Sequence, residues 1–311
     1  MTVNSTSVPP STWQTALLKR HGLGAAYLEA ALKWFAPLAQ SLAEHHHGAS
    51  RPILVAINGC QGSGKTTLGD YLCAALAAEH DLTAVALSLD DFYLTRTERD
   101  ALASTVHPLL STRGVPGTHD IALLADTLTR LLVPGSPEEV AIPRFDKSLD
   151  DRRPLSDWDS VPSPVQVVLL EGWCLGAVPE SADALSMPLN ELEINEDPEG
   201  RWREYSNGVL ERDFLPLYQV IDQWVMLAAP SFDCVYEWRR EQEQKLAVSL
   251  SSSEAVGLMN DEQLRRFIQH YERITRACLQ QLPSRSNHLF RLDEQRKILS
   301  YSQPSSTGES G

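Results

Sequence analysis

The stretch of residues 51–70, RPILVAINGCQGSGKTTLGD, constrains this chain more than any other part of it. Its first half, Pro52 to Ile57, is rich in β-branched and leucine side chains, which is typical of a buried parallel strand. Residues 59–66 match the pattern G-x-x-x-x-G-K-[ST] at every position that the pattern defines. A helix is expected to begin at Thr66. A strand, a glycine-rich turn and a helix in this order predict a phosphate-binding loop rather than an ordinary turn.

Each residue type in this loop has a chemical reason. Glycines let backbone N–H groups turn inward around a phosphate chain, where a Cβ atom would clash. Lys65 supplies a positive charge to the β- and γ-phosphates, and the Thr66 hydroxyl can ligate Mg²⁺. The residues expected to bind the nucleotide are Gly59, Cys60, Gln61, Gly62, Ser63, Gly64, Lys65, Thr66 and Thr67. The motif predicts nucleoside triphosphate binding, but it does not by itself distinguish a kinase from a GTPase or an ATPase.

The charge and hydropathy of the chain limit the kinds of molecule that it is expected to bind. The formal net charge of −14 argues against a nucleic-acid binder that works through a basic surface. No apolar run approaches the length of a membrane span, and the N-terminus lacks the apolar core of a signal peptide. We therefore expect a cytoplasmic protein that acts on a small molecule, with no nucleic-acid or membrane partner. The oligomeric state is left open.

The five cysteines indicate free thiols. They are odd in number, scattered, and never spaced as C-x-x-C, which fits a reducing cytosol without a zinc site. Cys60 has two interpretations because it lies inside the loop. A thiol beside a helix N-terminus can have a lowered pKa and be reactive. The interpretation we favour is a small filler at a position where the motif tolerates many residues.

Hydrophobic patterning predicts strands alternating with helices. The expected strands are 52–57, 82–89, 165–170, 223–228 and 288–292, and the main expected helices are 66–79, 121–132, 209–222, 232–246 and 261–282. This alternation predicts a doubly wound, mostly parallel α/β sheet. Residues 12–43 are expected to be helical, with breaks at Gly22 and Gly24 and a kink or division at Pro37. The histidines at 45–47 are interpreted as a solvated linker rather than a metal site.

Acidic residues follow two of the predicted strands, where parallel sheets bind their ligands. Asp90 and Asp91 come after the strand at 82–89 and precede Phe92 and Tyr93. We expect them to be functional, although a turn or helix cap built from Asp is the alternative. Glu171 follows the run VVLL and resembles the acid that holds Mg²⁺ in phosphate-loop enzymes. The expected metal ligands are Thr66, Asp90 and Glu171.

Several polar side chains in loops are candidates for binding a substrate. They are Asp91, Tyr93, Arg113, His119, Asp120, Arg144 and Lys147. Asp120 is equally well placed to cap the helix at 121–132. Arg144 and Lys147 either contact an anionic substrate or pair with neighbouring acids on the surface. Arg239 and Arg240 either reach over the phosphates as a lid or belong to a solvated helix face.

Seven stretches together resemble the D-glycerate 3-kinase family and its bacterial P-loop kinase relatives, which are related to uridine kinase, phosphoribulokinase and pantothenate kinase. They are GCQGSGKTTL, SLDDFYLTR, RGVPGTHD, PRFDKS, EGWCLGA, VYEWRREQE and NDEQLRRFIQHYERIT, in that order. The resemblance covers about Ile53 to Leu292. It implies a P-loop kinase domain at 51–300. The apolar spacing and the composition of the flanking segments predict a helical extension at 1–50 and a disordered tail at 301–311.

The resemblance also implies roles for individual residues. ATP and Mg²⁺ would bind the loop, and the γ-phosphate would pass to a hydroxyl group. Asp90 matches the acid that faces the acceptor in a D-x-F-Y stretch, Glu171 resembles the second acid near Mg²⁺, and Arg239 and Arg240 resemble lid residues. Lys65, Asp90 and Glu171 are thus the expected catalytic residues. The chain departs from the plant pattern after the D-K-S tract, where SLDDRRP replaces a G-x-G-D-R stretch.

We expect the reaction to be the phosphorylation of a small hydroxy acid, D-glycerate to 3-phosphoglycerate. A nucleoside or a pantothenate-like acid is the alternative acceptor. A non-enzymatic, nucleotide-dependent switch or assembly factor is the competing class. A switch would keep the phosphate-binding loop, but it would need neither an acid at Asp90 nor an acceptor site.

Overall fold

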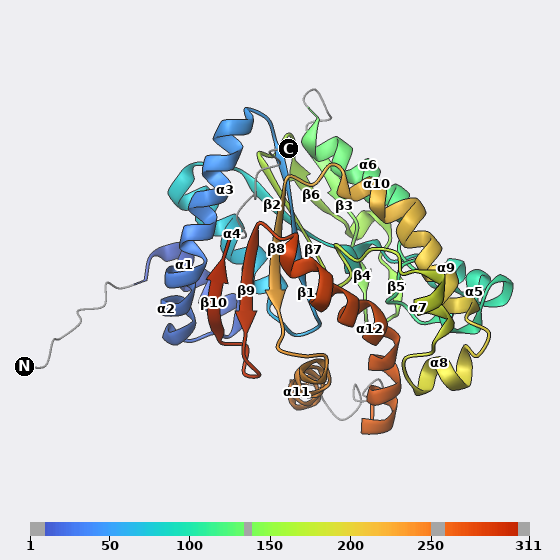
Figure 1. The fold of residues 1–311 in the computed structure, drawn as a ribbon. Coiled ribbons are helices and arrows are strands. Elements are labelled where there is room, and N and C mark those ends of the chain that lie inside the picture. The colour runs from blue at the N-terminus through green and yellow to red at the C-terminus, as the bar shows by residue number, and fades with distance from the viewer. Residues whose placement is uncertain (1–9, 134–138, 250–258, 304–311) are drawn as a thin grey trace, which may run out of the picture.

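A six-stranded sheet forms the centre of the fold (Figure 1). The computed structural model describes residues 10–133, 139–249 and 259–303. The sheet has the order β10-β9-β8-β1-β7-β2 and is made of β1 (Ile53–Gly59), β2 (Ala84–Ser88), β7 (Val167–Gly172), β8 (Gln223–Ala228), β9 (His288–Leu292) and β10 (Ile298–Ser302). Neighbouring strands are parallel except for β9 and β10, which pair antiparallel. The predicted mostly parallel α/β sheet is confirmed.

Helices pack on both sides of this sheet (Figure 1). They are α1 (Thr12–His21), α2 (Ala25–Trp34), α3 (Ala36–Ala49), α4 (Lys65–His80), α5 (Arg96–Thr105), α6 (Ile121–Leu132), α7 (Ala182–Ser186), α8 (Glu191–Glu196), α9 (Arg201–Val209), α10 (Leu215–Tyr218), α11 (Asp233–Ser249) and α12 (Asp261–Gln281). Two short ladders pair β3 (Glu139–Ile142) with β6 (Asp159–Pro162), and β4 (Phe145–Asp146) with β5 (Asp151–Arg152). No helix in the described ranges is both long enough and apolar enough to cross a membrane.

The central strand β1 divides the core into two layers because its successive side chains point to opposite faces. Ile53, Val55 and Ile57 join one hydrophobic cluster, together with side chains from α1–α4 and α11. Leu54 and Ala56 join a second cluster, together with side chains from α6, α10 and α12. All five side chains are fully buried. A strand buried on both faces explains why the sequence shows a continuous apolar run here instead of alternation.

The N-terminal helices share the first of these clusters. Leu38 and Leu42 of α3 are fully buried in it, and α1 and α3 pack on α4. His21 Nε2 also lies 2.9 Å from an Asp70 carboxylate oxygen on α4. Helix α1 ends at Gly22, whose φ of 62° is the left-handed conformation favoured by glycine, and Pro37 lies in the first turn of α3. The predicted breaks are therefore confirmed.

Three expectations from the sequence need correction. The histidines at 45–47 lie in the last turns of α3 rather than in a linker, since that helix continues to Ala49. They belong to no metal-binding group among the described residues.

The helix expected from residue 209 begins at Arg201, because the Asp197 carboxylate accepts hydrogen bonds from the backbone N–H groups of Trp202 and Arg203. Strand β10 was not expected, and it extends to Ser302 past the predicted boundary at 300. Of the expected tail, residues 304–311 lie outside the described part of the chain.

The shared cluster makes a testable prediction about stability. Leu38→Ala should lower the free energy of unfolding by about 2–5 kcal/mol, because it opens a cavity at a fully buried position. Leu32→Ala, at a side chain that is 45% exposed on the neighbouring helix, is the matched control and should cost about 0.5 kcal/mol or less. Urea unfolding followed by circular dichroism measures both. Equal losses for the two variants would contradict the assignment of α3 to the core.

Candidate active site

The phosphate-binding loop, residues 59–67, connects the end of β1 to the start of α4. Gly64 precedes the helix with a φ of 98°, a backbone conformation that other residues rarely adopt. At Gly59 a Cβ atom would lie 2.5 Å from Ser63 Oγ, so a larger residue would not fit. The first N–H groups of α4 have no partner within the helix, as at every helix N-terminus. The loop and these N–H groups together form a site for an anion.

The polar atoms of this loop suit a triphosphate. Lys65 Nζ donates a 3.1 Å hydrogen bond to the carbonyl oxygen of Cys60. In the described part of the chain, Ser63 Oγ and both polar atoms of the Gln61 side chain are buried without a hydrogen-bond partner. Unsatisfied buried polar groups are costly, and phosphate oxygens are strong acceptors for the Ser63 hydroxyl and the Gln61 amide N–H groups, whereas the Gln61 amide oxygen can only accept. The loop therefore has the donors that a bound triphosphate requires.

Cys60 is not an activated thiol. Its side chain is only 4% exposed, and burial raises the pKa of the thiol to about 12 in spite of the nearby charge of Lys65. A thiol with this pKa is almost fully protonated at neutral pH, so the hypothesis of a reactive loop cysteine is wrong. The physical reason is that desolvation of the thiolate outweighs its attraction to the charge of Lys65.

Two oxygen ligands suited to Mg²⁺ meet beside the loop. Thr66 Oγ1 donates a 2.9 Å hydrogen bond to Oε1 of Glu171, which lies one residue before the end of β7 and is 7% exposed. A polar cavity of about 290 Å³ opens next to both side chains. The described residues contain no cluster of three or more His, Cys, Asp or Glu side chains that could hold a metal. Mg²⁺ in nucleotide sites usually takes one or two protein ligands and completes its shell with phosphate and water, so Thr66 and Glu171 fit this role.

Asp90 is held by two side chains. Lys147 Nζ donates a 2.6 Å hydrogen bond to Oδ2 of Asp90, and the Tyr93 hydroxyl donates a 3.1 Å hydrogen bond to Oδ1. Burial by itself would raise the pKa of Asp90. The charges of Lys147 and Lys65 outweigh burial and hold this pKa well below its usual range. Asp90 is therefore a permanent anion at neutral pH, and its role as a metal ligand stays a prediction.

Asp91 has different hydrogen-bond partners from Asp90, although the partners of both acids include residues of the segment 144–147. It accepts hydrogen bonds from Arg144 Nη1 at 2.9 Å and from the backbone N–H of Phe145 at 3.1 Å. Arg144 also donates a 2.6 Å hydrogen bond to Asp159. The two carboxylates diverge because β2 ends at Ser88 and residues 89–92 form a 3₁₀ turn, whereas we had expected the strand to run to Leu89.

Arg113 lies within electrostatic reach of Lys147 but is already paired with an acid. Its guanidinium forms an ion pair with Asp150, which also binds the fully buried Arg99 at 3.0 Å. The Arg113 guanidinium lies 5.5 Å from the centre of the Phe145 ring, and its positive charge is within electrostatic reach of Lys147. Neither Arg99 nor Asp150 had a sequence motif that marked it. Two arginines that share one carboxylate leave a net positive charge at this position.

His119 and Asp120 follow each other but have different surroundings. The His119 ring stacks on Tyr93 with centroids 4.4 Å apart, and both of its ring nitrogens lack a partner among the described residues. Burial lowers the pKa of His119 to about 4, so the ring is neutral at pH 7. Asp120 caps α6 by accepting from the Leu123 N–H at 2.9 Å, and its other oxygen accepts from Arg152 at 3.1 Å. Asp120 thus performs the capping role that the sequence allowed.

The candidate lid arginines lie on α11. Arg240 pairs with Glu237 at 2.5 Å and is 43% exposed, which is the pattern of a solvated helix face. Arg239 lies 5.8 Å from the centre of the Phe267 ring, and its charge is within reach of Tyr271. Their contact with phosphates stays a prediction. Sequence reasoning missed Arg296, which donates a 2.9 Å hydrogen bond to the carbonyl oxygen of Gly62 in the loop.

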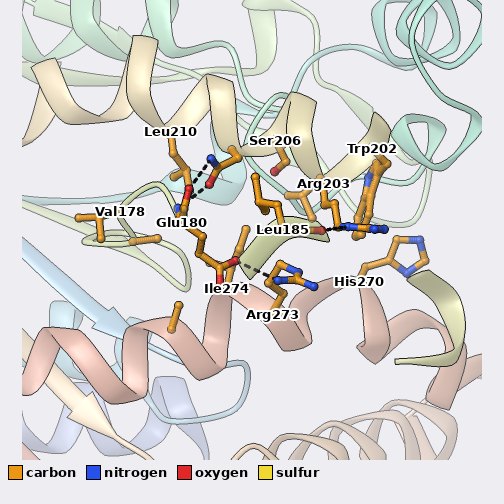
Figure 2. A pocket seen from close by; sticks show the side chains of 14 residues that line it. Val178, Glu180, Leu185, Trp202, Arg203, Ser206, Leu210, His270, Arg273 and Ile274 are labelled. Carbon is orange, nitrogen blue, oxygen red and sulfur yellow. Dashed lines mark hydrogen bonds and ion pairs between the residues drawn. The ribbon is translucent and has the colours of Figure 1, made fainter. Parts of the chain in front are cut away.

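A second cavity lies between α9 and α12, away from the loop (Figure 2). Its volume of about 20 Å³ is room for about one water molecule, far too little for a nucleotide or a hydroxy acid. Its charged side chains are paired internally: Arg273 binds Glu193 at 2.6 Å, and Arg203 binds Asp197 at 3.0 Å. This cavity is therefore not a site for either ligand.

Comparisons with known proteins place the chain among P-loop kinases. It is 36% identical over 233 residues to the uncharacterised kinase mug58 of Schizosaccharomyces pombe, covering 71% of this chain and 79% of that protein. It is 31% identical over 231 residues to the chloroplastic D-glycerate 3-kinase of Arabidopsis thaliana, covering 71% of this chain and 46% of the plant protein. Less than half of the plant enzyme is thus matched. No family model matches the chain.

A solved structure agrees with these relatives. The D-glycerate 3-kinase of Cryptococcus neoformans var. grubii superposes with a TM-score of 0.71 at 27% identity, over 90% of this chain and 99% of that one. The fold and the loop define a P-loop kinase. The chain belongs to the family of P-loop kinases that includes D-glycerate 3-kinase.

The divergence of Asp90 and Asp91 gives a prediction. Asp90→Asn keeps the shape and removes the charge, so turnover should fall by roughly 10²–10⁴-fold while ATP still binds. The low end is expected, because a loose phosphoryl-transfer transition state needs little help from a base. Asp91→Asn is the matched control and should affect stability more than turnover, since it weakens the contact to Arg144. Steady-state kinetics and ATP binding measure both. If Asp91→Asn is inactive and Asp90→Asn is active, then Asp91 and not Asp90 is the acid on the acceptor side.

The pairing of Asp90 with Lys147 gives a second prediction. Lys147→Met removes the charge that keeps Asp90 ionised, so burial should then raise the pKa of Asp90. Activity that needs this carboxylate should then be lost at a higher pH than in the wild type as the solution is acidified. The pH profile of kcat/KM measures the shift. Arg144→Met, which removes the partner of Asp91, is the control. It should leave unchanged the pH at which kcat/KM falls on acidification, called here the acidic limb of the profile. Coincident acidic limbs for wild type and Lys147→Met would refute the pairing.

Proposed function

We propose that this protein transfers the γ-phosphoryl group of ATP to a hydroxyl group of a small hydroxy acid, with D-glycerate as acceptor and 3-phosphoglycerate as product. The observation that supports the proposal most is the gathering of charges at the carboxyl ends of β1, β2 and β7. Asp90 is within electrostatic reach of Lys65 and Lys147, and Lys147 is within reach of Glu171 and Arg113. The named relatives in plants and Cryptococcus support the choice of acceptor.

Positioning and charge neutralisation carry most of the catalysis in such a transfer. The loop and Lys65 bind the triphosphate, and Lys65 stabilises negative charge that develops on the transferring group. When bound at Thr66 and Glu171, Mg²⁺ supplies further neutralisation of the phosphate oxygens. Asp90 accepts a hydrogen bond from the acceptor hydroxyl and orients its oxygen toward the γ-phosphorus. Its low pKa makes it a weak base, which is adequate because the acceptor bond is little formed in a loose transition state.

Local cations hold the acceptor, since the protein as a whole is acidic. Arg113 is our candidate for the acceptor carboxylate, because it and Arg99 share the single carboxylate of Asp150 and a positive charge remains. Arg144 is a weaker candidate, because both Asp91 and Asp159 already bind its guanidinium. The sequence SLDDRRP, in which this chain departs from the plant pattern, contains Asp150. The surroundings of Arg113 are therefore the part of the site most specific to this chain.

A panel of acceptors tests the function. ATP consumption should depend on D-glycerate and be slow with glycerol, which keeps both hydroxyl groups of glycerate but has a hydroxymethyl group in place of the carboxylate. Uridine and pantothenate test the alternative acceptors. Arg113→Gln should raise the KM for D-glycerate by about tenfold or more and leave the KM for ATP unchanged, because it removes one charge-assisted hydrogen bond. Slow ATP hydrolysis at the same rate with and without each acceptor would indicate a nucleotide-dependent switch. A response to uridine or pantothenate alone would overturn the choice of acceptor.

A further inference from the structure

Arg296 connects three segments that are far apart in the sequence. It lies in the turn between β9 and β10, 234 residues from the glycine that it contacts. Its Nε donates a 2.9 Å hydrogen bond to the carbonyl oxygen of Gly62. Its Nη2 donates a 2.5 Å hydrogen bond to Glu241 on α11, and its guanidinium lies 5.2 Å from the centre of the Trp238 ring on the same helix. The phosphate-binding loop is thus linked to α11 through one side chain.

The turn that carries Arg296 is built to hold a fixed shape. Arg296 has a φ of 66°, which is unfavourable for a residue with a Cβ atom. The Asp293 carboxylate compensates by accepting hydrogen bonds from the backbone N–H groups of Gln295 and Lys297, each within 2.9 Å. Trp238 Nε1 on α11 donates a 2.7 Å hydrogen bond to the carbonyl oxygen of Glu294. A strained backbone conformation such as that of Arg296 is stable only where several surrounding contacts compensate for its cost.

The contact with Gly62 fixes one peptide plane of the loop. The N–H of Ser63, on the other side of the same peptide, donates to the carbonyl oxygen of Cys60 at 3.2 Å. Because N–H and C=O point in opposite directions in a trans peptide, the plane is held from both ends. The Cys60 carbonyl also accepts from Lys65 Nζ. A shift of this peptide would therefore move the lysine that serves the phosphates.

We propose that Arg296 is a positioning residue for the nucleoside triphosphate: it holds the loop in its binding conformation from outside and ties it to α11. This proposal depends on the proposed function in one respect only, namely that the loop binds ATP. The competing interpretation is a structural link between the turn and α11, without effect on the ligand. The two differ in one measurable respect, because only a positioning residue changes nucleotide affinity in a protein that is still folded.

The experiment compares variants in the absence of any acceptor. Arg296→Asn removes the guanidinium, and Asn tolerates the left-handed backbone better than most residues, so the turn should survive. The dissociation constant for a non-hydrolysable ATP analogue with Mg²⁺, measured by calorimetry, should rise roughly tenfold or more, as expected for a lost charge-assisted hydrogen bond. Thermal unfolding without nucleotide reports on the fold. The analogue should also raise the unfolding temperature of the variant less than that of the wild type.

Two controls separate the interpretations. Glu241→Gln weakens the link to α11 but leaves the hydrogen bond to Gly62, so nucleotide affinity should change by no more than about twofold if the Gly62 contact carries the effect. Arg291→Asn changes the net charge equally at an exposed position on β9 and should leave affinity unchanged. Wild-type affinity in a folded Arg296→Asn protein would overturn the proposal. Because no acceptor is present, that outcome is distinct from a failure of the acceptor panel, which would overturn the hydroxy acid alone.

Discussion

Parallel pairing of three strands positions the whole site. The pairing sets Ile57 of β1 beside Glu171 of β7, and the same glutamate beside Ser88 of β2. Parallel strands end at one edge of the sheet, so the phosphate-binding loop after β1, the acid near the end of β7 and the acid after β2 are brought together there. A slip of one residue would turn each of these side chains to the other face of the sheet. The fully buried apolar residues of β1 and β7 prevent such a slip because both faces of these strands are packed.

Charge compensation is the second organising feature. The cations nearest the candidate acceptor site each have a carboxylate partner: Lys147 with Asp90, Arg144 with Asp91, and Arg113 with Asp150. In an acidic protein these pairs keep local cations in place beside the phosphate-binding loop. They also give the adjacent acids Asp90 and Asp91 different structural roles. Asp90 stays ionised beside the loop, whereas Asp91 fixes the segment that carries Arg144 and Phe145.

Long-range contacts support the loop from outside. Helix α1 reaches α4 through His21 and Asp70, and the turn between β9 and β10 reaches Gly62 through Arg296. The loop is glycine-rich and has few side chains of its own to hold its shape. The contact from Arg296 therefore supports the loop directly, and the N-terminal helices support the helix that follows it.

The sequence by itself determined the features that depend on contiguous residues. The loop was predictable because its glycines, Lys65 and Thr66 follow one another with fixed spacing. The central strands and several helices were predictable from buried runs and periodic apolar positions. Only the tertiary structure decided the strand order, the neutral state of Cys60 and the partners of the charged side chains. Asp90 and Lys147 are 57 residues apart, and Gly62 and Arg296 are 234 apart. Burial and ionic partners depend on how the chain folds back on itself, and no local pattern encodes them.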